Sequence, residues 1–259
     1  MKRGETIFPK VLLIARPAAG KSEIIAYLNN REPEERKERF HLGKLQEIDD
    51  FPMLWAWYEE DGILEEMGHE RIHTDKDGYF RWNYLWDVLI RRICLDYKKM
   101  IRDYPGIHKD HSVVFEFARG KEHGGYQRAF QHLTREVLNN LVVLYIDVSW
   151  EESLRKNRAR RNPDRPDSIL EHSLADEKLR TLYREDDWQD LEREEGALVI
   201  KGLRIPYYRF ENQKDYTTTG GEILGEKLEE AFDVLWKRYQ SLSGKDLNQK
   251  EKGGEARRI

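Results

Sequence analysis

The sequence is poor in several features that would each indicate a class of protein. Its 259 residues include one cysteine, Cys94, which excludes an internal disulfide and a cysteine-based zinc framework. An excess of one charge is also missing, because 45 Lys and Arg residues nearly balance 49 Asp and Glu residues. The sequence as a whole therefore does not favour nucleic acid or a membrane surface as a partner.

Long hydrophobic runs are absent as well. No stretch approaches the roughly 18 apolar residues that a membrane span requires. The apolar run at 11–14, which follows Lys2 and Arg3, is too short for the core of a signal peptide. These absences predict a soluble, cytoplasmic protein without a membrane partner, and the length suffices for one large domain with a sizeable core.

Short apolar runs bounded by polar segments recur along the chain instead. They are continuous rather than alternating, which is typical of strands buried on both faces of a parallel sheet. Helical patterns lie between them, so the order predicts an α/β layer fold with right-handed crossovers. The apolar runs are at 11–14, 112–117, 141–148, 197–200 and 207–210, and the helical patterns are at 22–28, 127–138, 153–161 and 224–239.

Residues 51–105 form a long, aromatic-rich insertion between these patterns. Its apolar spacing is helical, which predicts a helical subdomain with a local core, or a pocket or lid over a bound acceptor. An exposed tryptophan-rich face would also allow a homodimer contact. Residues 241–259 are polar and rich in Gly and Lys, which predicts a disordered tail and leaves 1–240 as the folded domain.

A phosphate-binding pattern directly follows the first apolar run, where residues 15–23 read ARPAAGKSE. In G-x-x-x-x-G-K-[ST], backbone N–H groups surround phosphate oxygens, the lysine reaches the terminal phosphates and the hydroxyl binds magnesium. Ala15 replaces the first glycine, which is tolerable unless that residue needs a positive φ. The alternative is a chance match at an ordinary helix start. The pattern assigns nucleotide binding to Ala18, Ala19, Gly20, Lys21, Ser22 and Glu23.

Acidic residues lie at the end of a possible second strand, at Asp49 and Asp50, and within the apolar run at 112–117, at Glu116. Asp49 and Asp50 stand where an acceptor hydroxyl would meet the γ-phosphate, although an Asp-rich turn before Pro52 explains them equally. Glu116 interrupts a buried strand, where an acid requires a metal or a partner. Arg119 could be that partner, so a structural ion pair is the alternative to a metal site at Glu116.

An arginine-rich segment, WEESLRKNRARRNPDRPDS, follows the run at 141–148. It is compatible with a solvated helix face or with a weak nucleic-acid patch. It is equally compatible with a mobile segment that closes over phosphates, because arginine makes bidentate phosphate contacts. The lid interpretation covers residues 151–190.

Taken together, these motifs resemble the nucleoside-kinase-like branch of the P-loop kinases, which contains adenylate kinase, uridine kinase and nicotinamide riboside kinase. The resemblance implies a three-layer P-loop NTPase fold with a mostly parallel sheet and a helical insertion. Departures are Ala15, a Glu-Phe where Glu-Gly is usual, and the length of the insertion. The similar segments span residues 8–240 in order and include RPAAGKS, DDF at 49–51, VVFEFARG, YIDVSWEESLRKNRARR and IPYYRFEN at 205–212.

The resemblance also implies an ATP- and Mg²⁺-dependent kinase. Lys21, Arg158 and Arg161 would stabilise the transferring phosphate. Arg155 and Asn212 would lie at the nucleotide. The partners would be a nucleoside triphosphate and a small hydroxylated or phosphorylated acceptor, such as a nucleoside, a nucleotide or a sugar.

Metal and acceptor roles follow from the same resemblance. Ser22 and Glu116 would hold Mg²⁺ directly or through water. Asp49 or Asp50 would act as the base that activates the acceptor hydroxyl. Asp50 and Arg119 would contact the acceptor itself.

Two other functions compete with this assignment. HERIH at 69–73 matches H-E-x-x-H, in which His69 and His73 would share a zinc ion and Glu70 would act as a base. Gly68 before it and TDKDG after it leave the required helix short and poorly bounded, so a zinc hydrolase is the remote alternative. The nearer alternative is a P-loop regulator or NTPase without a small-molecule acceptor.

Overall fold

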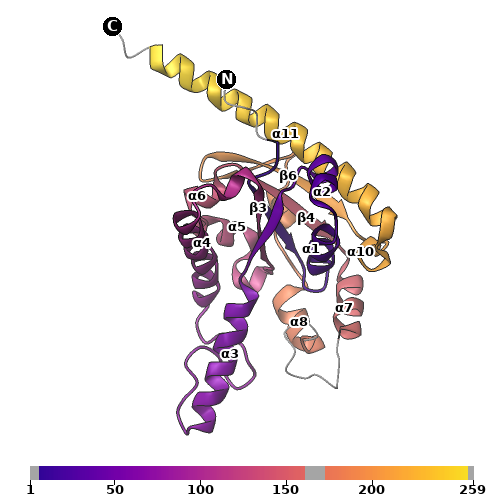
Figure 1. Cartoon of the computed structure of the whole chain (residues 1–259). Helices are drawn as coiled ribbons and strands as arrows, with labels where there is room; N and C mark the ends of the chain where they lie inside the picture. Colours follow the sequence, from indigo (N-terminus) through magenta and orange to yellow (C-terminus); the bar gives the residue numbers. More distant parts are fainter. Residues whose placement is uncertain (1–5, 161–172, 256–259) are drawn as a thin grey trace.

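A six-stranded sheet forms the centre of the structure, a computed structural model that describes residues 6–160 and 173–255 (Figure 1). The strand order is β2-β3-β1-β4-β6-β5, and all neighbours are parallel except β6 and β5. The expected mostly parallel α/β sheet is therefore confirmed. The strands are β1 (Lys10–Ala15), β2 (Lys44–Asp49), β3 (His111–Phe117), β4 (Leu141–Asp147), β5 (Ala197–Ile200) and β6 (Leu203–Glu211).

The run at 197–200 is an antiparallel edge strand, not a strand inside the parallel sheet. Lys201 and Gly202 connect it to β6 with left-handed φ angles of 49° and 77°, which suits a two-residue hairpin. Val199 is accordingly 70% exposed. An apolar run of four residues has the same sequence pattern in an edge strand and in a central strand. Its position in the sheet therefore depends on the strand with which it pairs.

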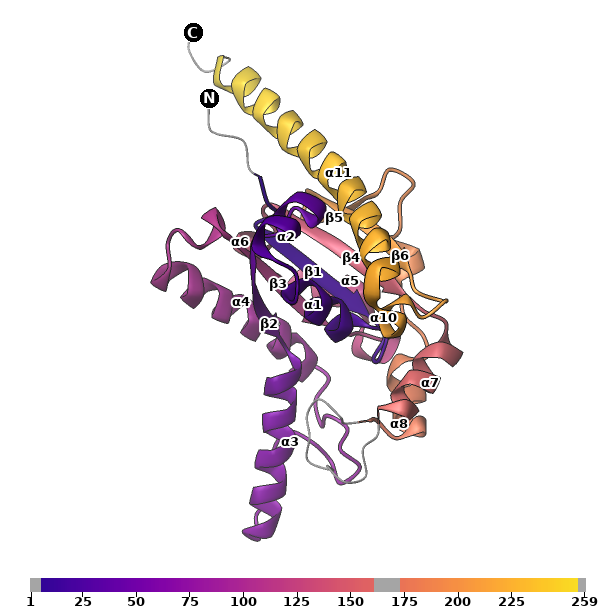
Figure 2. The ribbon, with the colours of Figure 1, turned by 45° about the vertical axis from the view of Figure 1, so that its right-hand side comes forward.

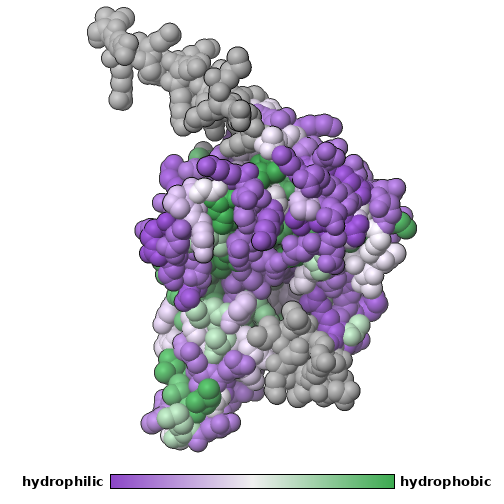
Figure 3. Space-filling view, viewed as in Figure 1, coloured by the Kyte–Doolittle hydropathy of each residue, from purple (hydrophilic) through white to green (hydrophobic). Residues whose placement is uncertain are grey.

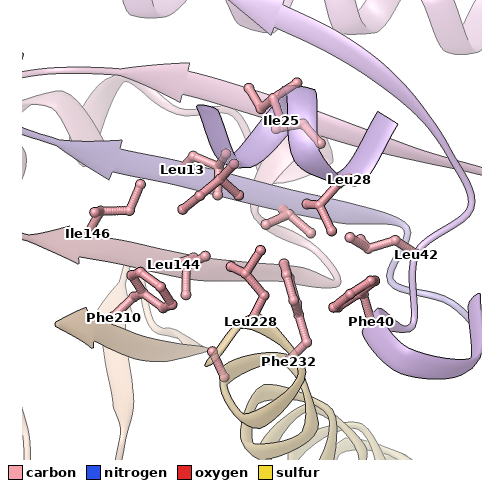
Figure 4. Close-up of a cluster of buried hydrophobic side chains, with 14 of the residues drawn as sticks. Leu13, Ile25, Leu28, Phe40, Leu42, Leu144, Ile146, Phe210, Leu228 and Phe232 are labelled. Atoms are coloured by element: carbon pink, nitrogen blue, oxygen red, sulfur yellow. The ribbon is translucent and has the colours of Figure 1, made fainter. Parts of the chain in front are cut away.

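Helices cover both faces of the sheet, which completes the three layers (Figures 1 and 2). On one face, helices α1, α2 and α11 pack against side chains such as Leu13 (Figure 4). On the other face, α4, α5 and α6 pack against Leu12 and Ile14. Adjacent residues of β1 thus enter opposite cores, as the alternation of side chains along a strand requires.

The expected helices are present, with shifts at their ends. The pattern at 127–138 is broken into two helices because Leu133 and Thr134 have extended backbone angles. The α-helices are α1 (Lys21–Asn29), α2 (Pro33–Phe40), α3 (Phe51–Glu66), α4 (Leu85–Asp103), α5 (Gly125–His132), α6 (Arg135–Leu138), α7 (Trp150–Ala159), α8 (Asp176–Tyr183), α9 (Trp188–Leu191), α10 (Tyr216–Thr219) and α11 (Gly221–Glu255). Short 3-10 helices occupy Ile107–Lys109 and Lys121–His123.

The insertion at 51–105 divides into a projecting arm and a core helix. Helix α3 extends away from the sheet, whereas α4 buries Ile90 and Ile93 in the core (Figure 1). Hydrophobic side chains gather at the far end of α3, where Ile63, Met67 and Ile72 are each more than half exposed (Figure 3). A homodimer contact through the insertion stays a prediction.

Helix α11 continues through Glu255 and so includes residues 241–255, which the sequence predicts to be disordered. The segment is rich in Lys, Glu and Gln, which are good helix formers. Adding turns to a helix whose first part is already packed avoids the unfavourable nucleation step of helix formation. Residues 256–259 of the expected tail lie outside the described residues. Among the described helices, none combines the length and apolarity needed to cross a membrane.

Candidate active site

Residues 15–22, which match the phosphate-binding pattern and which we call the phosphate loop after it, join β1 to α1 at the carboxyl end of the central strands. This is the usual ligand position in open α/β sheets. Ala15 is the buried last residue of β1 and has no positive φ, so the missing first glycine introduces no left-handed strain there. The left-handed residues of the loop are Ala18, at φ 58°, and Gly20, at φ 110°. For Ala18 this conformation costs about 1 kcal/mol.

Side chains from other segments hold the carbonyl groups of the loop. The Ser153 hydroxyl donates to the Pro17 carbonyl over 2.8 Å, and the Asn212 amide donates to the Ala19 carbonyl over 3.0 Å. Asn212 is fully buried, so it supports the loop from behind. We therefore correct its expected position at the nucleotide to a position beneath the phosphate loop.

A cavity of about 930 Å³ opens in front of the loop; we call it the phosphate cavity. It brings together residues from the start of α1, the end of β2 and the end of β3. Parallel strands end at the same edge of the sheet, which explains why segments distant in sequence meet here. Of the residues expected at the site, it is lined by Ala18, Lys21, Ser22, Glu23, Asp49, Asp50, Glu116 and Arg119.

Two carboxylates lie side by side in the phosphate cavity. Asp49 and Glu116 are register partners on β2 and β3, and both line the cavity. Burial, followed by the nearby charges of Glu116 and Asp50, raises the pKa of Asp49 to about 8, against the hydrogen bond from the Phe51 N–H. Oε2 of Glu116 is buried and has no hydrogen-bond partner. The pair is therefore short of positive charge.

Asp50 points to a different partner. Its Oδ2 lies 2.6 Å from Nη2 of Arg119, and the guanidinium carbon of Arg119 lies 5.1 Å and 5.3 Å from the ring centroids of Trp86 and Phe117. The structural alternative for Glu116, an ion pair with Arg119, is therefore wrong, because Arg119 binds Asp50. Asp50 is therefore the acid of the two that has a paired cation, and Asp49 is the one that lies beside Glu116.

The arginines of α7 occupy separate places. Arg155 pairs with Glu152 and Asp215, and Arg158 pairs with Asp176, in both cases outside the residues that line the phosphate cavity. Arg161 lies outside the described residues. Arg160 does line the cavity and lies 3.2 Å from Glu23 of α1. The arginine-rich sequence indicated an arginine near the bound phosphates but did not identify it as Arg160.

The H-E-x-x-H match does not form the helix that a shared zinc ion needs. Helix α3 ends at Glu66, and His69 and His73 lie in the irregular segment that follows. His73 stacks on Trp57 instead, with ring centroids 4.9 Å apart. Within residues 6–160 and 173–255, no cluster of three or more His, Cys, Asp or Glu side chains could hold a metal. This geometry removes the basis for the zinc alternative.

A second cavity, of about 520 Å³, adjoins the phosphate cavity; we call it the aromatic cavity. Its wall includes the rings of seven Phe, Trp and Tyr residues, from α3, the segment between α3 and α4, α4 itself and α8: Phe51, Trp55, Tyr58, Tyr79, Phe80, Trp86 and Tyr183. The sequence left a local core and a pocket as alternatives for the aromatics of the insertion, and six of these seven residues come from it. Five residues line both hollows and so lie between them: Phe51, Leu54, Trp86, Leu174 and Tyr183.

Buried polar groups shape the wall of the aromatic cavity. Asp61 is fully buried and accepts the backbone N–H groups of Ile72, His73 and Thr74, which holds this segment against α3. Burial lowers the pKa of His123 to about 2, so its imidazole is neutral. Lys178 of α8 donates to the carbonyl groups of Asp77 and Gly78 and thereby joins α8 to the insertion.

Comparisons with known proteins leave the family open. No protein-family model matches the chain, and no curated protein matches it. Among solved structures, an unliganded sugar kinase from Janibacter sp. HTCC2649 is similar over 87% of this chain and 94% of that chain. The TM-score is 0.39 and the sequence identity 13%, values that assign neither a family nor an activity.

Proposed function

We propose that this protein is a kinase that transfers the γ-phosphate of ATP to a hydroxyl group of a small acceptor. One observation carries the proposal. Lys21 and Ser22 of the phosphate loop line the same cavity as the carboxylates of Asp49 and Glu116. Phosphoryl transfer needs a phosphate cradle, support for Mg²⁺ and a group that orients the attacking hydroxyl, and these residues supply all three.

The residues present fit a magnesium ion. Asp49 and Glu116 hold an excess of negative charge, and the partnerless Oε2 of Glu116 is a free ligand position. Magnesium is usually held by one or two carboxylates together with substrate phosphates, so a larger acidic cluster is not required. Glu116 and the Ser22 hydroxyl would hold it. When bound, it would neutralise charge on the transferring phosphate.

The proposed reaction begins at the acceptor hydroxyl. Asp49 takes its proton while the oxygen forms a bond to the γ-phosphorus, and the bond from that phosphorus to the bridging oxygen breaks to release ADP. Lys21 contacts the migrating phosphate, and Arg160 stands at the same cavity. Cations that enter the cavity favour the ionised form of Asp49. Asp49 must be ionised before it can accept the proton of the hydroxyl.

The part of the acceptor that does not react is proposed to bind in the aromatic cavity. Among its described lining residues Lys178 is the one cation, and its amino group is already bonded to two carbonyl groups, whereas Asp77 and Glu122 are acidic. Such a wall suits an uncharged, ring-bearing alcohol better than a phosphorylated acceptor. The shared rim at Phe51 and Trp86 would let its hydroxyl reach Asp49.

The proposal is tested by ADP release from Mg-ATP across nucleosides, nucleotides and sugars. We expect release that depends on one class of ring-bearing alcohol, and a loss of at least 100-fold in Lys21→Ala. Lys37→Ala, which removes an exposed lysine of α2, is the matched control. ATP hydrolysis that no small molecule stimulates but RNA does would support the NTPase alternative and refute the kinase.

A further inference from the structure

A buried lysine lies behind the phosphate loop, on the side away from the phosphate cavity's lining. Lys156 of α7 is 5% exposed, and its Nζ donates to Oγ1 of Thr217 over 2.8 Å. It also forms an ion pair with Asp215, which caps α10. Burying an ammonium group is costly unless it is paired, and these two partners supply that pairing. Neither Lys156 nor Thr217 has a part in the proposed reaction.

Thr217 presses directly on the phosphate loop. A Cβ atom at Gly20 would lie 2.4 Å from Oγ1 and 2.6 Å from Cγ2 of Thr217, distances that real side chains do not tolerate. Gly20 is therefore required for two reasons, its φ of 110° and this close approach. The Thr217 side chain fills the space that any other residue at position 20 would need.

The Thr217 hydroxyl is held from two sides. Its Oγ1 accepts from Lys156 and from the Asn212 amide, each over 2.8 Å, and Asn212 also donates to the Ala19 carbonyl. The two donors fix the rotation of the threonine and so fix the methyl group against Gly20. A shift of the loop backbone at residues 19–20 would disturb this packing and these hydrogen bonds together.

We propose that Thr217, held by Lys156 and Asn212, is a lock that positions the phosphate loop to receive a triphosphate. The proposal rests on nucleotide binding at this loop, as the proposed function does. A loop held in its binding conformation loses less entropy when phosphate binds, and its N–H donors need no rearrangement. Thr217, Lys156 and Asn212 are positioning residues, since they act through Gly20 and Ala19.

The test uses Thr217→Val, which keeps the shape of the side chain and removes the hydroxyl, in the full-length protein. Thr217→Ser restores the hydroxyl, and Thr219→Val is the matched control, because Thr219 bonds to the Asp215 carbonyl within α10 and is exposed. Amide hydrogen exchange over residues 18–22 is measured without nucleotide. Dissociation constants are then measured for ATP and for inorganic tripolyphosphate.

We expect faster exchange and about tenfold weaker binding of both ligands in Thr217→Val, since one hydrogen-bonding group is lost. Thr219→Val should stay near wild type, Thr217→Ser, which keeps the hydroxyl but loses the methyl group against Gly20, should lie between wild type and Thr217→Val, and the KM of the acceptor should not change. Unchanged exchange in Thr217→Val overturns the lock whether or not nucleotide binds. Faster exchange with unchanged tripolyphosphate affinity overturns the link to phosphate binding. Failure of the wild type to bind either ligand refutes the proposed function, and the lock's role in binding with it.

Discussion

Nη2 of Arg119 lies 2.6 Å from Oδ2 of Asp50 and joins segments that are 69 residues apart in the sequence. The exposed fractions of the two side chains are 2% and 6%, so the charges neutralise each other away from water. Loss of one partner would leave an uncompensated buried charge, whereas loss of both would not. The pair thus fixes the end of β2 against the end of β3, where the two candidate acids lie.

Removing the guanidinium should destabilise the fold. We expect Arg119→Met to lower the free energy of unfolding by about 3–5 kcal/mol, as measured by urea denaturation. Asp50→Asn combined with Arg119→Met should recover much of the loss. Arg102→Met, at an exposed ion pair with Asp103, should change stability little. Wild-type stability in Arg119→Met would show that the pair is not formed.

Asp49 should be needed for activity and not for stability. Asp49→Asn removes one of two adjacent carboxylates, so its urea midpoint at neutral pH should equal or exceed that of the wild type. Its kcat should fall by about 10²- to 10⁴-fold, the range for loss of a general base. For Asp50→Asn we expect the reverse: a larger loss of stability than in Asp49→Asn and a smaller loss of kcat. Full activity of Asp49→Asn would exclude it as the base.

The carboxylate of Asp61 should make the free energy of unfolding depend on pH in acid. Burial raises its pKa, but hydrogen bonds from the Thr74 hydroxyl and from backbone N–H groups outweigh burial and lower the pKa to about 2. Because the folded-state pKa lies below the unfolded value of 3.8, the carboxylate contributes roughly 2 kcal/mol above pH 4, lost as the pH falls towards 2. The stability difference between wild type and Asp61→Asn should shrink over that interval. A constant difference from pH 7 to pH 2.5 would contradict the assignment.

Leu54 lines both cavities and offers a test of their continuity. Leu54→Trp should narrow the junction and raise the KM of the acceptor by at least tenfold, while the KM of ATP stays within about twofold, because the phosphate loop is untouched. Met53→Trp adds the same ring at the adjacent position of α3, which is not among the lining residues of either cavity. An equal effect of both variants would mean that α3 is disturbed in general.

Part of the site could be predicted because its chemistry is local in the sequence. The glycine, lysine and serine of the phosphate loop are consecutive and follow a buried strand, so their place at a strand-to-helix turn needs no tertiary information. The sequence also singled out Asp49 and Glu116 as candidate site residues, each from its own segment. Parallel strands end together, although neither strand reveals the other's register.

Other assignments depended on contacts that the chain makes at a distance. The sequence offered the nearby Glu116 as a partner of Arg119, whereas the structure pairs Arg119 with Asp50, 69 residues away along the chain. Arg160, the residue that follows α7, lies 3.2 Å from Glu23, whereas Arg158, within α7, pairs with Asp176. The aromatic cavity arises where α3, α8 and the segment between α3 and α4 meet, so no single stretch of sequence contains it.

The sequence by itself determined the alternation of strands and helices and the position of the phosphate loop, because these follow from short-range hydrophobic patterns and from consecutive residues. The tertiary structure decided which charges pair, that Asp49 lies beside Glu116 while Asp50 binds Arg119, and that Thr217 packs against Gly20. Those outcomes depend on sheet register and on side-chain packing between segments distant along the chain. Contacts between such segments contribute free energy only after folding has brought them together.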